Sequence, residues 1–177
     1  MSTYFAFTQS FSQRESPQTI AVRNFITDHW QDCYRFAYSQ VKQKQTAEDI
    51  VQEAAAKALQ HAHTLRNIDA IKPWFYRILL NEANTYFRKQ KNLVLQDEGL
   101  ESNPSHSESA AEQQLLLKLD LYKAVHQLPP ELKTIIILRF WEDMKLSEIA
   151  HITQTNENTV KTRLRRALQQ LQRLYEK

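Results

Sequence analysis

The stretch whose residue types are best suited to binding lies near the C-terminal end, at residues 156–166. It carries amides, hydroxyls and cations of the types that contact base edges and phosphates in DNA. These are Asn156, Glu157, Asn158, Thr159, Lys161, Thr162, Arg163, Arg165 and Arg166. Apolar residues recur among and beyond them at intervals of three and four, from Val160 to Leu174, which predicts a helix with one buried face. The stretch therefore predicts a helix that presents a polar, basic face to DNA.

A shorter apolar-periodic segment, residues 146–152, precedes this helix. A polar turn joins the two, and Thr155 or Asn156 can cap the second helix with a side-chain oxygen. A short helix, a tight turn and a basic helix together describe a helix-turn-helix. The alternative is an ordinary amphipathic helix with a solvated basic face. The preceding helix and the capped turn favour DNA binding.

Composition narrows the possible fold and chemistry. The chain has 177 residues, a net charge of +3, one cysteine and one glycine. A single cysteine excludes an internal disulfide and a cysteine-based zinc site, and the presence of only one glycine argues against phosphate-cradling loops and hairpins. In a helix, the spacing of His61 and His63 would put the two rings on different faces, so we expect surface histidines and no metal site. No nucleophile–base pattern is visible either, so we expect no cofactor, small-molecule substrate or enzymatic activity. Without a signal peptide or a bilayer-length apolar run, a soluble cytoplasmic protein is expected.

The expected architecture is all-α, with two small helical domains joined by a flexible linker. Residues 1–15 are expected to form a flexible extension. Residues 16–91 should form a first domain of three helices, the first running from Ser16 to about residues 42–45 and the second beginning at Thr46. The third should begin near Pro73. Residues 92–111 are rich in Ser, Asn and Pro and read as the linker, and residues 112–177 form the helix-turn-helix domain.

Three polar residues in the second predicted helix share one face. Asp49, Gln52 and Glu53 are spaced i, i+3 and i+4. A structural interpretation is favoured from the residues alone, because Asp49 can cap and acids complement the N-terminal end of a helix. Gln52 and Glu53 are too far along to cap, however, which leaves a polar face available to a partner.

The third predicted helix interleaves aromatic rings with cations, a pattern that suits single-stranded nucleic acid. The candidates are Trp74, Tyr76, Arg77, Asn81, Tyr86 and Arg88. We expect Trp74 and Phe87 to belong to the core, and Tyr76, Tyr86 and Arg77 to be available for binding.

Three segments together resemble a known family. They are YRFAYSQVKQKQTAEDIVQEAAAKAL (residues 34–59), PWFYRILLNEANTYFRK (73–89) and LPPELKTIIILRFWEDMKLSEIAHITQTNENTVKTRLRRALQQL (128–171). In this order they resemble an RNA polymerase sigma factor of the extracytoplasmic-function group of the sigma-70 family. Leu80, Thr85, Lys145, Gln154 and Asn158 depart from the pattern of that family, the last two standing where glycine is common.

The resemblance implies partners and roles. Asp49, Gln52 and Glu53 would dock on a coiled coil of the polymerase clamp. The helix that carries Trp74, Tyr76, Arg77, Asn81 and Arg88 would capture the melted downstream promoter element, and residues 64–72 would hold a flipped-out base. Residues 156–166 would read the upstream element as duplex. The implied partners are core RNA polymerase, promoter DNA and an anti-sigma factor, often membrane-bound.

The alternative is a self-sufficient helix-turn-helix regulator that binds operators as a dimer. It would need a dimerisation surface or a ligand pocket in residues 16–91, and it would not need the acidic docking face.

Overall fold

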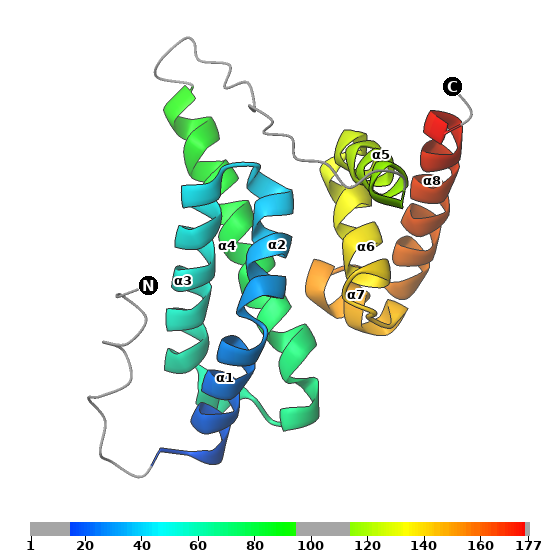
Figure 1. Cartoon of the computed structure of the whole chain (residues 1–177). Helices are drawn as coiled ribbons and strands as arrows, with labels where there is room; N and C mark the ends of the chain where they lie inside the picture. Colours follow the sequence, from blue (N-terminus) through cyan, green and yellow to red (C-terminus); the bar gives the residue numbers. More distant parts are fainter. Residues whose placement is uncertain (1–14, 95–113, 176–177) are drawn as a thin grey trace.

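The computed structural model describes residues 15–94 and 114–175, and within those ranges the chain is helical without strands, which confirms the all-α prediction (Figure 1). The first half consists of α1 (Pro17–Asp28), α2 (Trp30–Val41), α3 (Lys44–Gln60) and α4 (Ile71–Val94). Two short 3-10 turns, η2 (Ala62–Thr64) and η3 (Ile68–Ala70), connect α3 to α4. The second half consists of α5 (Gln114–Gln127), α6 (Pro130–Phe140), α7 (Leu146–Thr153) and α8 (Glu157–Tyr175).

Several predicted boundaries shift in the structure. Residues 1–14 and 95–113, which hold nearly all of the predicted extension and most of the predicted linker, lie outside the described residues. Helix α4 continues to Val94, so the first three residues assigned to the linker are helical. Helix α3 begins at Lys44, before the predicted start at Thr46, and no side chain caps it.

The first predicted helix is divided in two. Ser16 caps α1 as expected, because its hydroxyl oxygen accepts the backbone N–H of Thr19 at 3.2 Å and Pro17 follows it. The prediction of one helix up to residue 42 is wrong, however, because His29 leaves the helical conformation (φ −111°, ψ 16°). The break lets α1 pack against η2, α3 and α4, while α2 runs beside α3 and α4. Tertiary packing thus overrides a local helical pattern.

Small residues on α3 bring the helices of the first half close together. Ala47, Ala54 and Ala58 are fully buried along one side of α3, where it faces α2 and α4. Phe36 and Phe75 fill the space between the neighbouring helices. This core holds the polar face of α3 outward and fixes the direction of α4.

Helix α6 is the centre of the second half. All seven residues from Leu132 to Leu138 are buried, so the helix has no solvent-facing side along that length. Helices α5, α7 and α8 pack on it from its own half (Figure 1), and α2 packs on it from the first half. Two of the seven buried residues are polar, and both contact α2. The Lys133 ammonium donates to the carbonyl oxygen of Ser39 at 2.6 Å, and the Thr134 hydroxyl donates to Gln40 Oε1 at 3.1 Å.

The imidazole of His126 on α5 lies near this junction and has no hydrogen-bond partner among the described residues. Both of its ring nitrogens are buried, and its ring lies 4.2 Å from that of Tyr122. Burial, together with the nearby charges of Lys133 and Lys42, lowers the pKa of His126 from 6.5 to about 4. Between about pH 4 and pH 6.5, His126 is therefore protonated more often in the unfolded chain than in the folded chain.

We predict that His126→Phe stabilises the fold at pH 7 by roughly 1 kcal/mol, since it removes two buried polar atoms that lack partners and keeps the ring. The wild-type protein should lose stability as pH falls from about 6.5 towards about 4, because protonation of His126 favours the unfolded chain. The variant should lose less over that window. Urea denaturation at pH 7 and pH 5 measures both effects.

His63→Phe, at an exposed histidine, is the matched control. An equal acid dependence of wild type and His126→Phe would contradict the assignment.

Candidate nucleic-acid interface

Helix α8 is oriented by a capped turn. The Asn156 side-chain oxygen accepts the backbone N–H of Thr159 at 2.7 Å and its hydroxyl at 2.9 Å, which confirms Asn156 as the cap. Gln154, at the position where the family commonly has glycine, adopts the left-handed conformation with φ 54°. The backbone N–H of Thr155 closes the turn on the carbonyl of Ala150 at 3.0 Å. The turn thus forms without glycine.

The packing of α8 leaves its first turns open to solvent on one face. Val160, Ala167 and Leu171 are buried against the rest of the second half. Leu168 and Leu174, which the periodicity assigned to the buried face, are exposed. The exposed candidates for DNA contact are Asn156, Glu157, Asn158, Lys161, Thr162, Arg165 and Arg166.

Two of the candidate cations on α8 already have partners. The Lys161 ammonium lies 2.9 Å from a carboxylate oxygen of Glu157, one turn earlier on the exposed face. Arg163 is half-buried, and its guanidinium lies 2.7 Å from Glu131 of α6. The structure does not place Arg163 with the other DNA-facing candidates, because this ion pair ties it to the scaffold. The pair instead fixes α8 against α6.

The three polar candidates on α3 are exposed together. Asp49, Gln52 and Glu53 lie on the outer side of the helix, away from its contacts with α1, α2 and α4. Asp49 does not cap, because α3 begins five residues before it. Glu53 lies 3.3 Å from Lys57, whose ammonium also binds Glu82 of α4 at 2.7 Å. Helix capping therefore does not explain the polar character of this exposed face.

The candidates on α4 separate into two groups. Asn81 and Arg88 are exposed, and Trp74 and Tyr86 are half-buried against the core. Phe87 was predicted to be buried but is 43% exposed.

Tyr76 shows the largest departure from expectation. The prediction that Tyr76 is accessible is wrong for this conformation, because the residue is 0% exposed and its ring packs edge-on against Phe36 at 5.2 Å. Its hydroxyl donates to Glu142 Oε2 of the second half at 2.6 Å, and burial raises its pKa well above the usual value. Arg77, beside it, lies 3.3 Å from the ring nitrogen Nε2 of His151 on α7. The second half therefore covers this part of α4.

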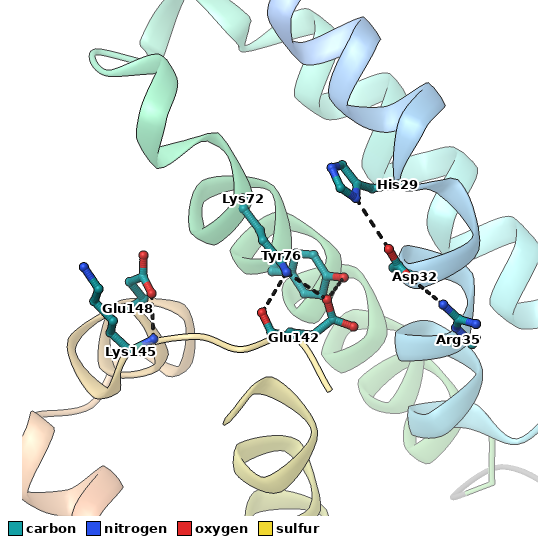
Figure 2. A network of polar contacts seen from close by, with 8 residues as sticks. All are labelled: His29, Asp32, Arg35, Lys72, Tyr76, Glu142, Lys145 and Glu148. Carbon is teal, nitrogen blue, oxygen red and sulfur yellow. Dashed lines mark hydrogen bonds and ion pairs between the residues drawn. The ribbon is translucent and has the colours of Figure 1, made fainter. Parts of the chain in front are cut away.

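Glu142 is the residue that sequence reasoning missed. It lies in the corner between α6 and α7, residues 141–145, and is only 8% exposed (Figure 2). The Lys72 ammonium lies 3.2 Å from the same carboxylate oxygen and donates to the Glu142 carbonyl at 2.7 Å. The corner is shaped by Asp143, whose φ of 50° is left-handed, and by a hydrogen bond from Arg139 to the Met144 carbonyl. An acid just beyond a helix gives no sequence signal of burial, since its partners are 66 and 70 residues away.

Two further features of the described residues bear on other functions. No three histidine, cysteine, aspartate or glutamate side chains in residues 15–94 and 114–175 lie close enough to hold a metal ion. The helices within these ranges include none that is both long and apolar enough to cross a membrane. His61 and His63 are exposed side chains.

Comparison with known protein families assigns each half of the chain to a region of one family. Residues 25–93 match the family described as Sigma-70 region 2, and residues 118–171 match Sigma-70, region 4. The chain is 51% identical over 144 residues to RNA polymerase sigma factor SigV of Bacillus subtilis, covering 81% of this chain and 84% of that protein. It is 30% identical over 145 residues to the ECF RNA polymerase sigma factor SigM of the same organism, covering 81% and 88%.

A solved structure extends the similarity to the fold. The sigma factor RpoE of Bartonella quintana, in complex with the anti-sigma factor NepR, superposes with a TM-score of 0.72 at 26% identity and covers 87% of this chain and 96% of that chain. With both sigma regions in order and these relatives matched over most of their length, this chain belongs to the extracytoplasmic-function group of the sigma-70 family of RNA polymerase sigma factors.

Proposed function

We propose that this sigma factor uses three separate surfaces to join core RNA polymerase to a promoter. As a sigma factor it binds the core enzyme and directs promoter-specific initiation. The docking surface is the exposed face of α3 formed by Asp49, Gln52 and Glu53. The duplex surface is the exposed face of α8, and the strand surface is the face of α4 that carries Asn81 and Arg88.

The observation that carries this proposal is the exposed, capped first half of α8. Its residue types reach base edges at the N-terminal turns and phosphates further along, as expected of a recognition helix in a major groove. The Arg163–Glu131 ion pair and the buried side of α8 hold that face at a fixed orientation. A self-sufficient dimeric regulator is not favoured, because residues 25–93 match a sigma region. Run-off transcription with core polymerase across a promoter library tests the proposal.

We also infer an anti-sigma factor as a protein partner. The support is the similar RpoE structure, which is a complex with the anti-sigma factor NepR. The chain acts without a catalytic step of its own, by positioning the polymerase, and its place of action is the cytoplasm, where polymerase and chromosome meet.

We predict that Gln52→Ala combined with Glu53→Lys weakens binding to core polymerase by about 2 kcal/mol or more, since interface hot spots reach that size. The isolated protein should stay folded, because both side chains are exposed and the Glu53–Lys57 pair contributes only roughly 0.3–0.5 kcal/mol. A pull-down titration against core enzyme measures the affinity. Asp28→Lys, at an exposed acid on α1, makes the same charge change at a different site. Equal affinities for both variants would rule out the α3 face.

A second prediction separates base reading from phosphate contact on α8. Lys161→Ala should change which upstream element the holoenzyme prefers and cost about 1–3 kcal/mol on the cognate element. Arg166→Ala should weaken binding similarly on all sequences and reduce the salt dependence by about one phosphate contact.

Binding to a randomised upstream element at several salt concentrations measures both effects. Arg173→Ala, on the same side of α8 two turns further on, is the matched control and should leave both unchanged. If Lys161→Ala weakened all sequences equally while Arg166→Ala changed the preference, the two roles would be reversed.

A further inference from the structure

One acidic side chain stands on the basic face that α8 is proposed to present to duplex DNA. Glu157 begins this helix and is the only aspartate or glutamate between residues 157 and 175. Its side chain is 45% exposed, on the turn where the base-reading residues are proposed to lie. A carboxylate beside a polyanion is unfavourable unless it meets a hydrogen-bond donor. Attraction to phosphates therefore does not explain Glu157.

Support of the helix explains only part of this placement. The cap is Asn156, whose side-chain oxygen accepts the backbone N–H of Thr159 at 2.7 Å. An acid in the first turn complements the helix dipole, and an aspartate there would do so equally well. Glu157 has the longer side chain, and its carboxylate lies 2.9 Å from the Lys161 ammonium, one turn further on. Both side chains of this ion pair are exposed, so DNA can reach it.

The ion pair matches the major-groove edge of one kind of base pair. A carboxylate can only accept hydrogen bonds, and an ammonium can only donate them. In a C·G base pair the cytosine N4 amino group, a donor, lies beside guanine O6, an acceptor. A base-pairing hydrogen bond joins these two atoms, so their separation is similar to the 2.9 Å between Glu157 Oε1 and Lys161 Nζ. Glu157 can thus accept from N4 while Lys161 donates to O6 and to guanine N7.

We propose that Glu157 and Lys161 read a single C·G base pair of the upstream element as one unit, and that Glu157 determines which strand carries the cytosine. This inference rests on the proposed contact of α8 with duplex DNA. Glu157 lies over the cytosine and Lys161 lies over the guanine. The ion pair already present in the free chain holds both groups in the arrangement that the base pair requires.

The same two groups reject the other base pairs to different degrees. A reversed G·C pair places guanine acceptors against the carboxylate and the cytosine amino group against the ammonium, so both contacts are lost. A T·A pair likewise places an acceptor, thymine O4, against the carboxylate. An A·T pair keeps a donor beside an acceptor, but adenine N7 faces the second carboxylate oxygen and the thymine methyl group crowds the ammonium. The expected order is C·G, then A·T, then the two reversed pairs.

Glu157 also affects how Lys161 contacts DNA. The carboxylate holds the ammonium over the first turn of α8 and offsets its charge. Without Glu157, Lys161 would be released to a phosphate, a salt-dependent contact that carries no sequence information. Glu157 therefore lowers the affinity for DNA in general and raises the discrimination between sequences.

The test uses holoenzyme assembled from core polymerase and each full-length variant. Binding to a pool of duplex promoters with a randomised upstream element identifies the preferred C·G position. Affinities are then measured at several salt concentrations on four duplexes that carry each base pair at that position. Glu157→Ala removes the carboxylate, and Glu157→Gln replaces it with a neutral amide. Asp143→Asn is the matched control, since it removes a charge from a side chain that is 99% exposed and asparagine tolerates the left-handed backbone there.

We expect wild type to favour C·G over the reversed G·C pair on the order of tenfold. Glu157→Ala should lose most of this preference, bind the other three duplexes more tightly and gain about one phosphate contact in its salt dependence. Glu157→Gln should instead prefer A·T, because a glutamine amide pairs with adenine N6 and N7. Asp143→Asn should match wild type on all four duplexes.

Different results would overturn the inference and the function on which it rests. The inference is wrong if wild type prefers no C·G pair, or if that preference is unchanged in both Glu157 variants. A purely structural role of Glu157 would make Glu157→Ala and Glu157→Gln behave alike, without a shift towards A·T. In each of these cases Arg166→Ala would still lower the salt dependence. If Arg166→Ala and the Glu157 variants all left binding to the upstream element unchanged, the proposed duplex surface itself would be wrong.

Discussion

The burial of α6 on all sides is the constraint on which the arrangement of the other helices depends. A helix with seven consecutive buried residues has to be covered around its whole circumference. Helices α5, α7 and α8 cover most of it, and α2 of the first half covers the remainder. The side that meets α2 presents Lys133 and Thr134, whose polar groups water can also satisfy. The helix can therefore lose its cover from the first half without exposing its most apolar side.

In this arrangement, cations that look alike in the sequence differ in whether they form ion pairs between helices or remain exposed. Arg163 is tied to Glu131 and stabilises the position of α8, whereas Arg165 and Arg166, beside it in the chain, remain exposed. Lys57 similarly joins α3 to α4 through Glu82, and the opposing carboxylate raises the pKa of Lys57. Charge count alone does not distinguish a cation that binds DNA from one that holds the scaffold.

Sequence patterns within a few residues were sufficient to predict most of the helices and two of the helix caps. Ser16 and Asn156 cap as predicted, because capping depends on residues only three positions apart. The break at His29 and the burial of Tyr76 were not predictable, because both depend on helices that lie far away in the sequence. The candidate face of α3 was predicted from helical spacing alone. The covered part of α4 required knowledge of where the second half packs, which helical periodicity does not contain.

The three left-handed residues among the described positions, Lys42, Asp143 and Gln154, each directly follow or closely follow the end of a helix, and none is glycine. A non-glycine residue in this conformation costs about 1 kcal/mol, so surrounding packing has to impose it. At Gln154 that packing sets the angle between α7 and α8. If the packing of the second half loosened, this turn would relax and the angle between α7 and α8 would no longer be fixed. The base-reading residues of α8 would then lose their fixed position on duplex DNA.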